Sequence, residues 1–401
     1  MATEQKRSML VIAAGSEVAD AIVNAFSGEH DLRIDTKDTT LAQMNGKAIR
    51  AMADYDVIMF QASPDDSSDI EAIQTLVSNR SNETTLVALA DGDISLSKAR
   101  ALSNAGVDEV LPLPKGDGEI DAQMLRLSRK KAARHSGGAV HQGCLIAVAQ
   151  ARGGVGSTTV AVNLADQLCL GKGRFSRGTK PKVALVDLDL QFGTIGSFLD
   201  LGEQDALLQL AMDGKVPDAT FLTQSMVDLP SGLSVLAAPS SFAPLDSLRS
   251  DQVAAIIDTL RESYDFVVVD MPRALVGWIE PIVQRADEMM VVTDMSVSSV
   301  RHCRRLIDFF TQDNLSLPVQ VVVNHQHKPL MQTRLHREAA KVLDRKLEHW
   351  LPHDPRAACG AADRGKPLSV AAPRSPLGKA MSRLARATLS GRQLATQQAA
   401  K

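Results

Sequence analysis

The sequence predicts two α/β domains in succession, each built on a mainly parallel sheet with helices on both faces. Three observations lead to this prediction. Short apolar runs alternate with amphipathic stretches, most of the later runs are apolar throughout, and one basic, glycine-containing segment interrupts the alternation. Alternating strands and helices form parallel sheets, and strands covered on both faces are continuously apolar. The 401 residues suffice for two or three domains.

The first domain is expected over residues 1–128. Five short apolar runs predict its strands, and the segments between them carry apolar residues at helical spacing. The runs are SMLVIAA (8–14), DLRID (31–35), DVIMFQA (56–62), TLVALA (85–90) and EVLPL (109–113). Five strands within this length match a small flavodoxin-like domain.

The second domain is expected over residues 144–390. A basic, glycine-containing linker over 129–143 precedes it, and a flexible tail over 391–401 follows it. The expected strands are CLIAVAQ (144–150), VALVDLDL (183–190), LSVLAAP (233–239), FVVVDMP (266–272), EMMVVTDM (288–295) and PVQVVVN (318–324). Their uniform apolarity places them in the middle of a doubly wound, mainly parallel sheet.

The composition is that of a globular chain, with 44% hydrophobic and 23% charged residues and a formal net charge of −3. This charge gives no overall attraction to nucleic acid. The four cysteines are scattered, which favours reduced thiols in a cytosolic protein. The apolar run near the N-terminus is too short for a signal peptide, and no stretch approaches the length of a membrane span. We expect a cytoplasmic protein, attached at most peripherally to a membrane.

A glycine-rich turn, QARGGVGSTTVAVN (150–163), joins the first strand of the second domain to a helix. This is the context of a phosphate-binding loop, whose backbone N–H groups and helix N-terminus face phosphate oxygens. Thr158 stands where the Mg²⁺-binding hydroxyl belongs. Against the pattern G-x-x-x-x-G-K-[ST], however, Ala151 replaces the first glycine and Ser157 replaces the lysine. A glycine-rich turn without a ligand remains the alternative for this stretch alone.

Aspartates end two further apolar strands, at Asp187 and Asp189 in one and at Asp270 in the other. The carboxyl edge of a doubly wound sheet is where its ligands bind. A carboxylate there can hold Mg²⁺ or orient an attacking water. A single aspartate after a strand is often only a helix cap. The glycine-rich loop followed by two strands that end in aspartate is much less common by chance, and it favours a nucleotide site.

These segments resemble the MinD/ParA group of P-loop ATPases. ARGGVGSTT resembles its deviant Walker A motif, DLDLQFG its D-x-D segment and VVVDMP its hhhhDxP segment. The resemblance is closest to the CpaE/TadZ branch, which helps to assemble Tad-type pili, tolerates a small residue at the loop lysine and carries a degenerate receiver-like domain in front. The later segments YDFVVVDMPRALVGW, VVVNHQ, LPHDPRAA and GKPLSVAAPRSPLGKAM extend it over nearly the whole chain. It implies a P-loop NTPase fold for the second domain.

The resemblance also implies a site for ATP and Mg²⁺. Backbone N–H groups would face the phosphates, Thr158 and Asp187 would hold the metal, Thr159 would lie near the α-phosphate, and Asp270 would meet the metal through water. The loop residues concerned are Gly153, Gly154, Val155, Gly156 and Ser157.

The same resemblance assigns catalytic and base-binding roles. Asp189 would polarise the attacking water, and Arg152 would reach the partner's nucleotide in a face-to-face homodimer. Asn324 and the backbone around Pro352 would face the adenine. Because Ser157 lacks the charge that stabilises the transition state, we expect slow or absent hydrolysis, with ATP acting mainly as a dimer switch.

The first domain lacks the residues of a phosphorylatable receiver. Its first strand runs into AAGS (13–16), its third ends in FQA (60–62), and Leu113 stands where the lysine belongs. Asp65 and Asp66 lie past the strand end and match loop or helix-capping residues. We therefore expect a docking or dimerisation module.

The resemblance implies an assembly and localisation factor for Tad-type (Flp) pili. It would act with the secretion ATPase and other pilus components at the inner membrane, often at a cell pole, without binding specific nucleic acid sequences. The alternative is a ParA- or MinD-like positioning or partitioning ATPase acting on DNA or membrane. The basic segment 171–182 could contact DNA, but we expect a flexible, solvated loop there. The amphipathic C-terminal segment could reach a membrane, but we expect a helix packed on its own domain. A binding module that has lost its nucleotide is a third possibility.

Overall fold

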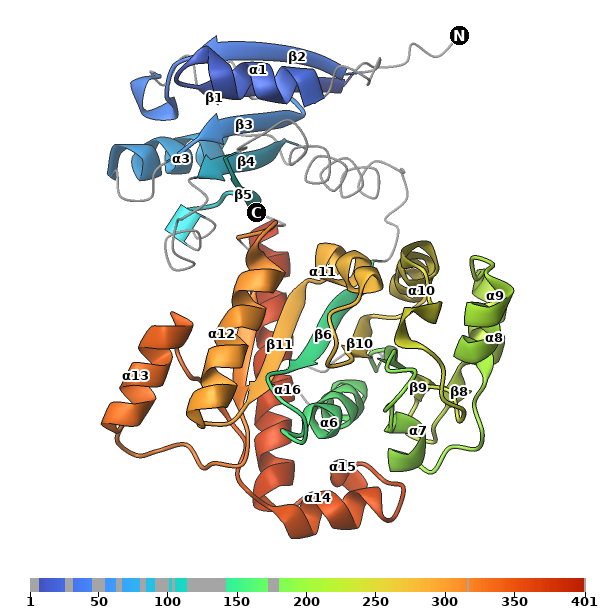
Figure 1. The fold of residues 1–401 in the computed structure, drawn as a ribbon. Helices are drawn as coiled ribbons and strands as arrows, with labels where there is room; N and C mark the ends of the chain where they lie inside the picture. The colour runs from blue at the N-terminus through green and yellow to red at the C-terminus, as the bar shows by residue number, and fades with distance from the viewer. Residues whose placement is uncertain are drawn as a thin grey trace. The chain divides into compact units, whose positions relative to one another are not determined.

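The protein is described from a computed structural model, which covers residues 7–25, 32–44, 55–62, 67–79, 84–90, 101–102, 105–113, 142–171, 180–315 and 317–399. The chain divides into two compact units. One comprises residues 1–137 with 310–316, and the other residues 138–309 with 317–399. Each unit contains one sheet (Figure 1).

The first unit contains a five-stranded parallel sheet in the order β2-β1-β3-β4-β5. This is the order of flavodoxin-like doubly wound folds. The strands are β1 (Arg7–Ala13), β2 (Leu32–Asp38), β3 (Val57–Gln61), β4 (Thr85–Ala90) and β5 (Glu109–Pro112), and the helices are α1 (Ser16–Ala25), η1 (Leu41–Gln43) and α3 (Ser67–Asn79). All five strands correspond to the apolar runs that predicted them.

Alternate residues of β1 enter two separate cores in this unit. Leu10 and Ile12 join a cluster with Ile73 of α3, whereas Met9 and Val11 join a cluster with Ile22 of α1. Successive side chains of a strand point to opposite faces, so α1 and α3 cover the two faces of the sheet.

The second unit contains an eight-stranded sheet in the order β13-β12-β11-β6-β10-β7-β9-β8. Its strands are β6 (Cys144–Gln150), β7 (Val183–Asp187), β8 (Val227–Asp228), β9 (Leu233–Leu236), β10 (Phe266–Asp270), β11 (Glu288–Thr293), β12 (Val319–Val323) and β13 (His349–Trp350). Only the β8–β9 pair is antiparallel among the described pairs. The mainly parallel sheet is as predicted, and the two-residue edge strands β8 and β13 were not predicted.

Helices lie on both faces of the second sheet, and α6 lies at the centre of one of them (Figure 1). The helices are α6 (Ser157–Cys169), α7 (Ile195–Phe198), α8 (Ala206–Asp213), α9 (Ala219–Ser225), η2 (Leu245–Ser247), α10 (Ser250–Ser263), η3 (Gly277–Ile279), α11 (Glu280–Arg285), α12 (Val297–Thr311), α13 (Arg334–Leu343), α14 (Pro355–Ala362), α15 (Leu368–Ala371) and α16 (Pro376–Ala399).

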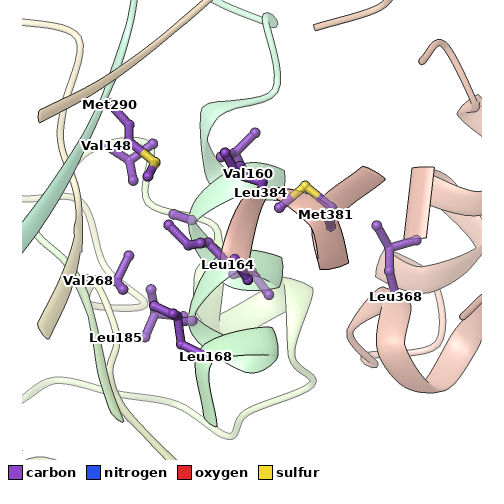
Figure 2. Packing of buried hydrophobic residues seen from close by; sticks show 14 of the residues in the cluster. Val148, Val160, Leu164, Leu168, Leu185, Val268, Met290, Leu368, Met381 and Leu384 are labelled. Atoms are coloured by element: carbon purple, nitrogen blue, oxygen red, sulfur yellow. The ribbon is translucent and has the colours of Figure 1, made fainter. Parts of the chain in front are cut away.

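Helix α6 is buried on nearly all sides. Val160, Leu164 and Leu168 belong to the cluster that also contains sheet residues and Met381 and Leu384 of α16 (Figure 2). A helix that is covered all round is held by the core rather than by solvent contacts. The turn that precedes α6 is therefore attached to a helix that is fixed within the core of the unit.

The C-terminal segment forms one long helix. α16 continues to Ala399, so the backbone of residues 391–399, expected as a flexible tail, is helical. The segment contains helix formers such as Leu394 and no proline, which explains the continuation. Leu377, Met381 and Leu384 are buried in the core, so this apolar face is already covered within the unit. No described helix combines the length and apolarity needed to cross a membrane.

Several predictions fall on residues outside the described part of the chain. These are residues 129–141 of the linker, residues 172–179 of the basic segment, and Asp65 and Asp66. The last linker residue, Gly143, is described and is closely packed. A Cβ there would lie 1.9 Å from the carbonyl oxygen of Tyr264. Gly143 therefore belongs structurally to the second unit.

Candidate nucleotide-binding site

The loop between β6 and α6 has a backbone shape that requires glycine. Gly154 and Gly156 have φ values of 74° and 88°, in the left-handed region that other residues rarely adopt. Gly156 is also the N-cap of α6, and a Cβ there would lie 2.6 Å from Nδ2 of Asn324. The backbone conformation of the loop therefore favours glycine at both positions.

A cavity of about 660 Å³ opens over this loop. It lies at the carboxyl ends of β6 and β10, and its volume is typical of small-molecule sites. Its lining includes Gln150, Gly153, Gly154, Gly156, Ser157, Thr158, Thr159, Asp189, Gln191, Phe192, Gly193, Asp270 and Arg273. The structure therefore brings the predicted loop and two of the three predicted aspartates to one cavity.

Thr158 and Asp270 both line the cavity and are hydrogen-bonded to each other. The hydroxyl of Thr158 donates to Oδ2 of Asp270 over 2.6 Å, while Oδ1 of Asp270 is buried and has no hydrogen-bond partner among the described residues. Burial, and then the charge of Asp187, raise the pKa of Asp270 well above its usual value. A cation would compensate both the burial and the missing partner, and hydroxyl and carboxylate oxygens are ligands that Mg²⁺ prefers. These residues fit a magnesium ion.

Asp187 holds the backbone that follows β7. Its Oδ1 accepts from the N–H of Asp189 and its Oδ2 from the N–H of Ile195, each over 3.1 Å. Burial raises the pKa of Asp187 to about 6. The strand register pairs Asp187 with Asp270, which explains their electrostatic interaction, although Asp187 does not itself line the cavity.

Asp189 lines the cavity and shapes the next turn. Its Oδ1 accepts from the N–H groups of Gln191 and Phe192, over 3.1 and 3.0 Å. This local pattern is typical of aspartate in turns. The carboxylate is thereby fixed in orientation at the edge of the cavity where the sequence predicted it.

Arg152 is engaged within its own chain. Its Nε donates to Oδ2 of Asp294 over 2.8 Å, its Nη2 contacts the same oxygen, and its Nη1 donates to the carbonyl oxygen of Gly153 over 3.2 Å. Burial alone would raise the pKa of Asp294, but hydrogen bonds from Ser296 and Arg152 hold it below its usual value. The predicted contact with a partner's nucleotide would require Arg152 to leave Asp294.

Asn324 supports the loop. Its Nδ2 donates to the carbonyl oxygen of Val155 over 2.8 Å, and its Oδ1 accepts from the N–H of His325 over 2.8 Å. Neither Asn324 nor Pro352 lines the described cavity, and the buried Val155 does not either. Contact of Asn324 and Pro352 with an adenine stays a prediction.

Sequence reasoning missed Arg273, which lines the cavity three residues beyond Asp270, the last residue of β10. The signal was present, because Arg273 directly follows the aspartate-x-proline segment at the carboxyl end of a central strand. A basic residue at that edge of the sheet faces the position of an anionic ligand.

A glycine loop entering a buried helix, with a cavity and acidic residues above it, defines an α/β nucleotide-binding domain of the P-loop type. A family model described as an AAA domain matches residues 143–317. The chain is 26% identical over 246 residues to the septum site-determining protein MinD of Synechocystis, a match that covers 60% of this chain and 88% of that protein. These similarities support assignment of the second unit to the MinD/ParA superfamily.

A second relative and one solved structure are also similar to part of this chain. The antiactivator FleN of Pseudomonas aeruginosa is 27% identical over 215 residues, covering 53% of this chain and 72% of FleN. The crystal structure of a ParA family ATPase from Chlorobium tepidum has the same fold, with a TM-score of 0.53 at 21% identity, covering 61% of this chain and 98% of that one. The superfamily predicted from the motifs is supported, and the CpaE/TadZ branch within it stays a prediction.

Proposed function

We propose that the second unit binds ATP with Mg²⁺ at the loop 151–156, and that the nucleotide controls dimerisation in a positioning role of the MinD/ParA kind. The observation that carries this proposal is the buried Oδ1 of Asp270, which lines the loop cavity beside the Thr158 hydroxyl and has no hydrogen-bond partner among the described residues. A buried carboxylate oxygen without a partner costs about 1–3 kcal/mol, which a bound cation would offset.

Different residues of the site would bind the phosphates, the metal ion and a water molecule. N–H groups of the loop and of the first turn of α6 would bind phosphate oxygens, aided by the helix dipole. Thr158 and Asp270 would hold Mg²⁺, which supplies charge neutralisation of the phosphates when bound. Asp189, oriented by its turn, would position a water molecule. Asp187, the register partner of Asp270, would support the metal by adding negative charge beside it.

Hydrolysis is expected to be slow. Ser157 provides no positive charge where phosphate loops carry lysine, and such charges are worth orders of magnitude in rate. We propose that the turnover stays below about 1 s⁻¹, and that nucleotide exchange rather than chemistry switches the state of the protein.

The positioning role rests on the relatives. One is named as a septum site-determining protein, a second as an antiactivator and a third as a ParA family ATPase. We favour a positioning or partitioning ATPase of this kind, with DNA or a membrane surface as the partner to be identified.

Tad-type pilus assembly is the second candidate. The flavodoxin-like strand order of the first unit favours it, because the CpaE/TadZ resemblance implies a degenerate receiver-like domain in front of the ATPase domain. In that case the partners are the secretion ATPase and other pilus components at the inner membrane. Loss of surface pili, rather than misplaced division or partition, in a deletion strain would select this candidate.

The proposal is tested by measuring the mass of the full chain by light scattering with ATP or ADP and Mg²⁺. We expect ATP to double the mass of the wild type and of Asp363→Asn, a control for loss of an exposed carboxylate. Asp270→Asn should stay monomeric. An ATP-independent mass, or an Asp270→Asn variant that dimerises like the wild type, would contradict the proposal.

A further inference from the structure

Among the described residues that line the cavity over the loop, two are acidic and one is basic. Asp189 and Asp270 line it, and Arg273 is the one Lys or Arg among the described residues that do. A phosphate group entering this cavity without a compensating charge would meet net negative potential. The residue that normally supplies the charge, the loop lysine, is Ser157 here.

The guanidinium of Arg273 lies close to the loop. Its Nη1 is 3.6 Å from the position that a Cβ on Gly153 would occupy. No hydrogen bond or ion pair connects the side chain to any described residue, and the side chain is exposed to the cavity. Arg152, the other arginine at the loop, is tied to Asp294. Arg273 is therefore the cation that is available to a ligand at this site.

The backbone below Arg273 is firmly held. The N–H of Met271 donates to the carbonyl oxygen of Val148 in β6 over 3.0 Å, and both Met271 and Pro272 are buried. Proline also fixes its own backbone φ. The guanidinium thus projects from a fixed point beside Asp270, and ordering it on a ligand costs only side-chain freedom.

We propose that Arg273 binds the terminal phosphates of the nucleotide within its own subunit and replaces the charge that is missing at Ser157. The inference rests on the proposed ATP site. A guanidinium is suited to this task because it is always charged and its planar set of donors matches phosphate oxygens. It approaches from the β10 wall of the cavity, whereas a loop lysine would extend from the start of α6.

Calorimetric titrations of the full chain with ATP and Mg²⁺ test this inference. Arg273→Ala should weaken ATP binding by about 10- to 100-fold, as expected for loss of a hydrogen-bonded charge. Arg273→Lys should recover part of the affinity. The control Arg383→Ala removes an exposed arginine of α16 outside the cavity and should bind like the wild type.

The same Arg273→Ala change in a Ser157→Lys variant shows whether the loss of affinity comes from a missing charge or from misfolding. Ser157→Lys restores a loop charge, so adding Arg273→Ala to it should cost much less affinity than in the wild type. Equal losses in both backgrounds, or Arg273→Ala binding within about two-fold of the wild type, would overturn this inference while the ATP site stands. Absence of ATP binding by the wild type at millimolar concentration would overturn the proposed function and this inference together.

Discussion

The side-chain amide of Asn324 donates a 2.8 Å hydrogen bond to the carbonyl oxygen of Val155, 169 residues earlier in the chain. The bond links the end of β12 to the phosphate loop, although β11 lies between β12 and β6 in the sheet. The same amide group lies against Gly156, where a Cβ would come within 2.6 Å of Nδ2 of Asn324. The shape of the loop therefore depends on a strand that is not its neighbour.

Replacing Asn324 by alanine should weaken both the fold and the site. The buried carbonyl oxygen of Val155 would lose its donor, so the free energy of unfolding should fall by about 1–3 kcal/mol. ATP affinity should fall as well, because the loop would no longer be held before binding. Urea denaturation and calorimetry measure the two effects. An unfolding free energy within about 0.5 kcal/mol of the wild type would show that the bond is dispensable.

Gly143→Ala should be strongly destabilising. Its Cβ would meet the carbonyl oxygen of Tyr264 at 1.9 Å, so the backbone at the start of β6 would have to move. We expect a loss of about 2–4 kcal/mol in the free energy of unfolding, measured by chemical denaturation. Gly360→Ala is the control, since nothing lies within 4 Å of its Cβ position and alanine favours helix α14. Similar stability of the two variants would contradict the packing at Gly143.

Asp294→Asn should release Arg152. The pair is partly exposed, with side-chain exposures of 41% and 14%, so its loss should change stability by less than about 1 kcal/mol. If Arg152 contacts a partner's nucleotide, its release should tighten the ATP-bound dimer by about 2- to 5-fold, measured by light scattering over a concentration series. Asp251→Asn breaks the exposed pair with Arg249 and serves as the control. A weaker ATP-bound dimer in Asp294→Asn would contradict a contact between Arg152 and the partner's nucleotide.

Glu288 should make the stability of the second unit depend on pH. Burial, together with the charge of Asp287, raises the pKa of Glu288 from 4.5 to about 7. Because this pKa lies above the unfolded value, the ionised side chain destabilises the fold above pH 7. The penalty fades as the pH falls from 7 toward 4.5.

Glu288→Gln should therefore raise the free energy of unfolding by about 1–3 kcal/mol at pH 8 and change it little at pH 5. Glu203→Gln, at an exposed position, should show no such dependence. Denaturation curves at both pH values provide the comparison. A gain that is equal at the two values would show that ionisation of Glu288 is not its cause.

The sequence predicts the main strands and the loop because their signals are local. Continuous apolar runs identify buried parallel strands, and the glycines of the loop stand beside the strand and helix they connect. The edge strands β8 and β13 contain two residues each and carry no such pattern. Helix α16 extends past Gly391 because one glycine among helix formers is a weak stop signal.

The contacts of the site depend on residues far apart in the chain. Arg152 and Asp294 are 142 residues apart, and no spacing rule pairs them or Asn324 with Val155. In this structure Arg152 and Asn324 both hydrogen-bond within the chain, and the contacts predicted for them, with a partner's nucleotide and with an adenine, stay predictions. Arg273 was missed because a residue after proline reads as an ordinary loop position.

The most direct test of the account is a calorimetric titration of the full chain with ATP, in Mg²⁺ and in EDTA. We predict stoichiometric, Mg²⁺-dependent binding that is lost in Thr158→Val, which removes the hydroxyl beside Asp270. Thr223→Val, which removes an exposed hydroxyl on α9, should bind normally. No binding at millimolar ATP, or identical curves with and without Mg²⁺, would contradict the claim that the serine-bearing loop is a working nucleotide site.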